Sequence, residues 1–278
     1  MVPTLSIVFM AISAIVSIGL PIALGIIWHK RTGAKASSLF IGAAAFVVFA
    51  IILENICHRL VLYGSGSCAA FMQSNLWAYG LYGALAAGVC EETGRLCAFK
   101  LLFKKKDDRC ESVMYGIGHG GVEAVMVSGL TMISYIAISA IINLSGGMAG
   151  LTVLGIGEDM ASVLMTAFTG TNPFMYLVSV IERIMAMAFH ISMSVLVFAA
   201  VKQKGRGWYY PLAIGLHALL DLGAIAYQTG IIKSIIAVEG YVLVFTALCV
   251  LLAVNRQHLW QGGLELINAR QAVMIKNK

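Results

Sequence analysis

The sequence has few charged residues. Asp, Glu, Lys and Arg make up 12% of its 278 residues, whereas a soluble globular domain carries about a quarter. Hydrophobic residues supply 60% of the chain. This composition excludes an ordinary soluble domain and predicts an all-α, polytopic helical membrane protein. Neither end has a polar segment large enough for a soluble domain, so we expect a single integral-membrane domain over residues 1–278.

The sequence also lacks paired cysteine spacings, a basic N-terminal region and a concentrated patch of positive charge. The six cysteines, at positions 57, 68, 90, 97, 110 and 249, show no CxxC or paired spacing, which favours free thiols over a disulfide framework or a zinc ribbon. The N-terminus lacks the basic region of a signal peptide, so its apolar run is expected to remain as a span. The net charge of +6 is not concentrated on a soluble domain, so we expect lipid headgroups and no nucleic acid as partners.

The apolar runs predict about seven transmembrane helices. Their approximate bounds are 3–28, 37–63, 76–103, 111–142, 173–201, 208–228 and 235–254. The fourth run is long for one crossing, which suggests a tilt or a break. The stretch 143–172 is expected to be a loop with one short helix, and Asn172-Pro173 predicts the start of the fifth span. We place a catalytic-like core at 76–228, peripheral spans at 3–63 and 231–255, and a cytoplasmic tail at 256–278.

Lysine and arginine are distributed unevenly between the predicted loops. They follow the first, third, fifth and seventh spans, whereas the loops between hold only Lys233. Positive residues mark the cytoplasmic side, so the pattern predicts an outside N-terminus and an inside C-terminus in a bacterial plasma membrane. No inverted repeat typical of many transporters is visible.

The third predicted span contains an energetic anomaly. Its apolar sequence is interrupted by Glu91, Glu92 and Arg95. An ionisable group at bilayer depth costs several kcal/mol unless it is paired or lines a wet cavity, which makes it a functional-site hypothesis.

Acids and histidines from three other spans fall at a similar depth. With a rise of 1.5 Å per residue, they lie roughly 12 to 20 Å from the cytoplasmic ends of their helices. Besides the two glutamates, the group comprises His119, Glu123, His190, His217 and Asp221. Structural ion pairing does not require four helices to meet at one level, so we interpret this layer as a site.

Sequence spacing sharpens this interpretation. Glu91 and Arg95, His119 and Glu123, and His217 and Asp221 are each separated by four residues, and Tyr115 shares the stripe of His119. The glycines around His119 would let another helix approach closely. Three imidazoles (His119, His190 and His217) with carboxylates could hold Zn²⁺ or another divalent metal. Alternatively, an acid beside a histidine activates water directly, and a second acid–histidine pair steadies the oxyanion.

A second polar layer lies nearer the predicted outer face. It consists of Glu54, His58, Arg59, Glu182 and Arg183. We interpret Glu54/His58 and Glu182/Arg183 as interhelical ion pairs with a structural role, and Arg59 as reaching outward to the interface.

The order of these motifs is familiar. Glu91-Glu92-x-x-Arg95, Tyr115-x-x-x-His119, His190 and His217-x-x-x-Asp221 resemble the four-motif layout of the CAAX-prenyl-protease and bacteriocin-processing superfamily of intramembrane peptidases. The segments Gly118-His119-Gly120-Gly121-x-Glu123 and Glu182-Arg183 to His190 are more closely similar to bacterial YhfC-type intramembrane metalloproteases. The motifs cover about half of the chain, and the sequence departs from the wider pattern in three places. The arginine comes one residue early, tyrosine replaces phenylalanine at 115, and the last motif ends in aspartate.

The resemblance implies an intramembrane endopeptidase that cleaves a membrane-embedded peptide or protein. In it, Glu91 or Glu92 would activate water with His119, His217 and Asp221 would stabilise the oxyanion, and His190 would be a further ligand. The early arginine predicts Glu91 as its partner, four residues away, and leaves Glu92 freer. A proton- or ion-coupled transporter and a non-catalytic regulator or immunity protein are the alternatives, because intramembrane acids and histidines suit transport equally well.

Overall fold

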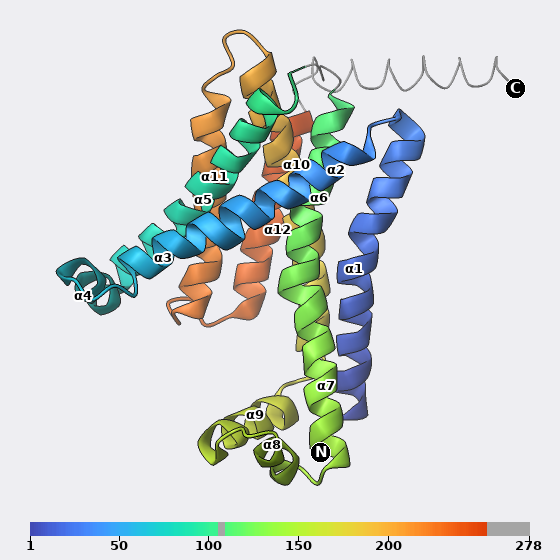
Figure 1. Ribbon diagram of the computed structural model, residues 1–278, viewed down its shortest axis with the longest axis vertical. Coiled ribbons are helices and arrows are strands. Elements are labelled where there is room, and N and C mark those ends of the chain that lie inside the picture. Colours follow the sequence, from blue (N-terminus) through green and yellow to red (C-terminus); the bar gives the residue numbers. More distant parts are fainter. Residues whose placement is uncertain (105–108, 255–278) are drawn as a thin grey trace, which may run out of the picture. The chain divides into compact units, whose positions relative to one another are not determined.

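The computed structural model describes residues 1–104 and 109–254. The predicted tail at 256–278 and the middle of the basic run after the third span lie outside the described residues. The described chain is all-helical (Figure 1). Its elements are α1 (Thr4–Thr32), α2 (Ala36–Phe46), η1 (Val47–Glu54), α3 (Asn55–Val61), α4 (Ser67–Ser74), α5 (Leu76–Leu101), α6 (Cys110–Glu123), η2 (Ala124–Gly129), α7 (Leu130–Leu144), α8 (Met148–Val153), α9 (Glu158–Gly170), α10 (Met175–Lys202), α11 (Tyr209–Gln228) and α12 (Ile235–Val254).

Six helical segments of the described chain are long and apolar enough to cross a membrane. They are Thr4–Thr32, Ala36–Val61, Cys110–Leu144, Met175–Lys202, Tyr209–Gln228 and Ile235–Val254. The third predicted span corresponds to α5, which is not among the six; Glu91, Glu92 and Arg95 lower its hydropathy. The prediction of an all-helical multi-pass membrane protein is therefore confirmed.

Two details of the sequence prediction need correction. Residues 143–172 form two helices, α8 and α9, where one was expected. Helix α10 begins at Met175, two residues after Pro173, because Asn172 closes a turn first: its side chain accepts the Phe174 N–H at 3.1 Å and its carbonyl accepts the Met175 N–H at 2.9 Å. The interruption expected in the long fourth span is the π-helical segment η2.

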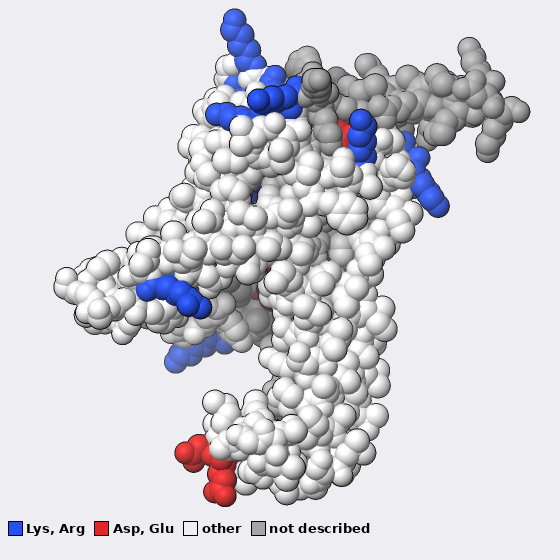
Figure 2. Space-filling view, in the orientation of Figure 1, with Lys and Arg blue, Asp and Glu red and all other residues white. Residues whose placement is uncertain are grey.

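The described chain divides into two compact units. The first comprises Met1–Ile22 and Glu123–Ile184. Its core is formed by residues of α1, α7, α8, α9 and α10, among them Met10, Ile142 and Phe168. The Asn143 side chain accepts the Val2 N–H at 2.7 Å. Acidic side chains gather on the α8–α9 segment, where Glu158 and Asp159 begin α9 (Figure 2).

The second unit comprises Ala23–Val122 and the chain from Met185 onward. Helix α5 packs against α11, η1, α2 and α4, and α11 also packs against α12. In Figure 1, α2, η1 and α3 follow one another along one continuous helical path. The core of this unit includes Phe99, Tyr115, Phe189 and Phe198. Helix α5 is therefore central to this unit, and it carries the charged residues of the third predicted span.

Glycines bring the helices of the second unit into backbone contact, as the sequence predicted for α6. A Cβ added at Gly118 would overlap the Leu39 carbonyl oxygen, and one at Gly42 would overlap the Tyr115 carbonyl oxygen. Helices α2 and α6 therefore cross with their backbones touching. On α5, a Cβ at Gly88 would lie 2.8 Å from the Ile214 carbonyl oxygen of α11.

We expect Gly118→Ala to destabilise the protein, because the added methyl group would force α2 and α6 apart. Overpacking of this kind costs about 1–3 kcal/mol, measurable as a lower melting temperature in detergent. Gly215→Ala on α11 is the matched control, since its added Cβ meets no atom within 4 Å. Equal melting of the Gly118→Ala variant and the wild-type protein would contradict the close crossing.

Candidate active site

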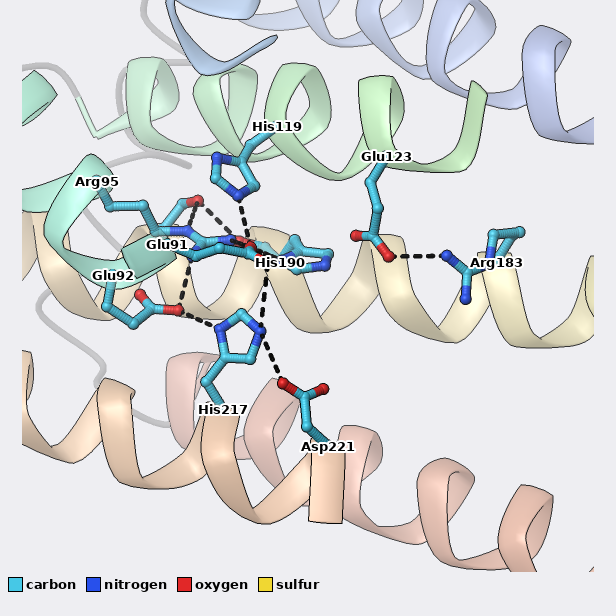
Figure 3. Close-up of polar contacts among 10 residues, drawn as sticks. Glu91, Glu92, Arg95, His119, Glu123, Arg183, His190, His217 and Asp221 are labelled. Carbon is cyan, nitrogen blue, oxygen red and sulfur yellow. Dashed lines mark hydrogen bonds and ion pairs between the residues drawn. The ribbon is translucent and has the colours of Figure 1, made fainter. Parts of the chain in front are cut away.

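The predicted polar layer converges on Glu91. This glutamate and its neighbour Glu92 come from α5, His119 from α6, His190 from α10, and His217 from α11 (Figure 3). All five side chains belong to the second unit, and each residue is at most 7% exposed. The four-helix convergence inferred from depth counting is thus present in the structure.

The Glu91 carboxylate faces three imidazoles. Its Oε2 lies 2.9 Å from His119 Nε2 and 3.7 Å from His190 Nδ1. Its Oε1 lies 3.8 Å from His217 Nε2. Only the His119 contact has hydrogen-bond length, so Glu91 and His119 form the closest acid–imidazole pair around this carboxylate.

Arg95 is bound mainly to Glu92. Its Nη1 donates to Glu92 Oε1 at 2.7 Å, whereas its Nη2 is 3.8 Å from Glu91 Oε2. The prediction that Arg95 pairs with Glu91 and leaves Glu92 freer is therefore wrong. The three-residue spacing of Glu92 and Arg95 on a helix allows this pairing as readily as the four-residue spacing does. Arg95 is completely buried, so an ionised Glu92 supplies the compensating charge that such a guanidinium needs.

Further hydrogen bonds fix the orientation of Arg95. Its Nη2 lies 2.6 Å from His190 Nδ1, and its Nε donates to Ser194 Oγ at 3.3 Å. The Ser194 hydroxyl donates in turn to the His190 carbonyl at 2.7 Å. Sequence reasoning missed Ser194, although it follows His190 by four residues and therefore shares its helical face.

His217 lies between carboxylates. Its Nδ1 donates to Glu92 Oε1 at 2.7 Å, and its Nε2 is 3.6 Å from Asp221 Oδ2. The Asp221 side chain is 30% exposed, which makes it the most accessible of the residues gathered here. Glu92 thus orients two groups, the Arg95 guanidinium and the His217 ring.

The two remaining predicted site residues differ in position. Tyr115 is fully buried, and its ring stacks on His119 with centroids 5.9 Å apart. Glu123 belongs to the first unit, where it accepts a hydrogen bond of 2.7 Å from Arg183. A supporting role for Glu123 in the site remains a prediction.

The second polar layer is paired differently from our expectation. Glu54 and His58 lie four residues apart on the continuous η1–α3 segment, with 3.2 Å between Oε1 and Nε2. Glu182 and Arg183 are neighbours on α10 and pair directly. Both pairs are therefore local, and the contact that links two helices is the one between Arg183 and Glu123.

One group among the described residues has the geometry of a metal site. The ligand atoms of Glu91, His119 and His190 lie within 4.8 Å of one another. Two histidines and a glutamate are a ligand set of catalytic zinc sites. The buried Nδ1 of His119 has no hydrogen-bond partner within the described part of the chain, so this ring has unused bonding capacity.

Charge also favours a cation here. Glu91, Glu92 and Asp221 set three carboxylates against the one guanidinium of Arg95, so with neutral imidazoles the cluster is formally negative. A buried net charge is costly, and a divalent cation or protonated imidazoles would compensate it. The residues fit a divalent metal, and a ligand role for His217 remains a prediction.

The fold and this cluster define a class: a multi-pass helical membrane protein with a buried glutamate–histidine centre. The chain belongs to the YhfC intramembrane metalloprotease family, whose sequence model matches residues 16–242. It is 38% identical over 262 residues to the Uncharacterized membrane protein YhfC of Bacillus subtilis (strain 168), with 94% of this chain and 100% of that protein covered. No solved structure matches the chain significantly. The family resemblance drawn from the motifs is thereby confirmed.

We expect Arg95→Gln to destabilise the protein strongly, because it leaves Glu92 buried without its cationic partner. Removing one member of a buried ion pair costs about 3–5 kcal/mol, which unfolding in detergent would report. The double variant Glu92→Gln/Arg95→Gln should recover much of this loss, because neither charge remains. Purely additive effects of the two substitutions would show that the pair is not energetically coupled.

Proposed function

We propose that this protein is an intramembrane peptidase that hydrolyses a peptide bond of a membrane-embedded peptide or protein. The observation that carries the proposal is the buried Glu91 carboxylate, surrounded by imidazoles from three other helices. The family name gives independent support. Chemistry must still be argued from the site, because a fold alone does not specify a reaction.

Glu91 is the best placed general base. It is hydrogen-bonded to His119 at 2.9 Å, whereas Glu92 is held by Arg95 and His217. In hydrolysis, Glu91 would take a proton from the attacking water as the water oxygen bonds to the carbonyl carbon. The same carboxyl group would then deliver the proton to the leaving nitrogen as the C–N bond breaks. Glu92 is then a positioning residue.

Histidines would stabilise the negative charge that develops on the carbonyl oxygen. His217 is oriented by Glu92 through Nδ1, and its Nε2 faces Glu91. As an imidazolium between the Glu92 and Asp221 carboxylates, His217 would carry a proton on Nε2 as well and could donate it in a hydrogen bond to the oxyanion, which agrees with the role that the resemblance implies for these two residues. His119 would help to orient the water beside Glu91.

A divalent metal such as Zn²⁺ would be held by Glu91, His119 and His190. When bound, it would lower the pKa of a coordinated water and polarise the scissile carbonyl. If Glu91 and His119 serve as ligands, the positioning of the water depends more on His217. Either way, the contact from Arg95 orients the His190 ring.

The proposed setting is a bacterial plasma membrane, with lipid and a membrane-embedded substrate as partners and no nucleic acid. The curated relative is a bacterial membrane protein. Helix α5 would cross the membrane in addition to the six candidate spans, because its charged residues are buried among α6, α10 and α11.

For the proposed topology, we expect alkaline phosphatase fused to the C-terminus to be inactive and the same reporter fused to the N-terminus to be active. The reason is the positive charge that follows alternate spans, which retains those loops in the cytoplasm. Phosphatase activity from a C-terminal fusion would show that the C-terminus is outside and that the proposed orientation is wrong.

We expect Glu91→Gln to lower peptide-bond cleavage by about 10²- to 10⁴-fold, because the amide cannot accept a proton. The measurement uses purified protein reconstituted with a library of membrane-embedded peptides, and new peptide ends are counted by mass spectrometry. Glu158→Gln, in the exposed first turn of α9, is the matched control and should retain wild-type cleavage. Full cleavage by both Glu91→Gln and His119→Ala would refute the peptidase assignment.

Metal content of the same preparations distinguishes the two mechanisms. If the wild-type protein contains stoichiometric metal and the His119→Ala variant does not, His119 is a metal ligand. Cleavage by metal-free wild-type protein would assign the chemistry to Glu91 alone.

A further inference from the structure

A second acid–histidine pair lies on the η1–α3 segment, outside the group around Glu91. Glu54 is the last residue of η1, and its Oε1 lies 3.2 Å from His58 Nε2. His58 Nδ1 lies 3.3 Å from the Tyr82 hydroxyl on α5, with the two ring centroids 5.6 Å apart. These three side chains therefore connect η1–α3 to the helix that carries Glu91.

This pair is electrostatically linked to the candidate active site. Glu54 interacts with Glu91, Asp221 and His217, and η1 and α11 both pack on α5. Exposure increases from the centre outward: the side chain of His217 is 3% exposed, Glu54 12%, His58 25% and Asp221 30%. Polar side chains thus extend from the buried centre towards partly exposed positions.

The backbone at Glu54 is unusual. Residues Val47–Glu54 form eight residues of π-helix within an otherwise α-helical segment. π-helical turns are rare and occur frequently at functional sites. Two ionisable side chains retained next to this irregularity, in a candidate membrane span, favour a hydrated surrounding over lipid.

We propose that Glu54, His58 and Tyr82 line the route by which water reaches Glu91. The proposal rests on the hydrolytic function above, because each cleaved peptide bond consumes one water molecule. Bulk water does not cross apolar packing, and buried water needs polar partners. The carboxylate, imidazole and phenol provide such partners between α3 and α5.

Cysteine chemistry tests this route directly. Cys90 precedes Glu91 and is partly buried. Its neighbour Val89 is 45% exposed and lies at nearly the same height on α5. Proteins with a single cysteine, either Cys90 alone or Val89→Cys alone, are reconstituted in lipid vesicles. They are treated with a charged trimethylammonium methanethiosulfonate or with a lipid-soluble maleimide.

We expect the charged reagent to modify Cys90 but not Val89→Cys, and the maleimide to modify both. Glu54→Leu or His58→Leu should lower the rate at Cys90 about tenfold or more, because a dry contact admits neither the ion nor the water that keeps a thiolate ionised. Glu54→Gln, which keeps a polar side chain, should preserve most of the rate. Unchanged maleimide labelling shows that each variant is folded.

Three results would overturn the proposal: no charged labelling of Cys90, equal charged labelling at positions 89 and 90, or a rate unaffected by Glu54→Leu and His58→Leu. The labelling does not depend on peptide cleavage. A protein that fails to hydrolyse peptides but labels as expected would retain the water route and lose the peptidase function. A protein that cleaves peptides but whose Cys90 is not labelled by the charged reagent would retain the peptidase function and lose the water route.

Discussion

The buried guanidinium of Arg95 is the constraint on which the candidate site depends. It is fully buried, so in a low-dielectric interior it must be paired and its donors must be satisfied. Glu92, His190 and Ser194 meet this requirement from two helices. The same contacts hold α5 and α10 in one register. His217 then joins through the Glu92 oxygen that Arg95 also uses, so a third helix is tied to the same group.

This arrangement separates the roles of two adjacent glutamates. Successive residues on a helix point about 100° apart, so Glu91 and Glu92 have different closest partners, although Arg95 and His217 lie within 4 Å of both. Glu92 contributes to a charged, hydrogen-bonded support, while Glu91 lies among His119, His190 and His217. The result is one carboxylate with a structural partner and one positioned for chemistry.

Close helix crossings make the cluster compact. Glycines on α2, α5 and α6 allow backbones to touch, and this brings short side chains such as those of Ser194 and Asp221 within reach of the centre. Glu54 and His58 pair within one helical segment. The charge of Glu54 nevertheless interacts with Glu91, Asp221 and His217 of the candidate site.

The sequence by itself determined the all-helical membrane class, the positions of the long helices and the family, because low charge, long apolar runs and motif order are properties of the linear chain. It also placed Glu91, His119, His190 and His217 in one layer, since depth follows from a fixed rise per residue. It could not choose between Glu91 and Glu92 as the partner of Arg95, because spacings of three and four residues both bring side chains together. It also missed Ser194 and the local pairing of Glu54 with His58. The contacts of Arg95 with Glu92 and Ser194 were decided by the packing of α5 against α10, which only the tertiary structure sets. The Glu54–His58 contact lies within one helical segment.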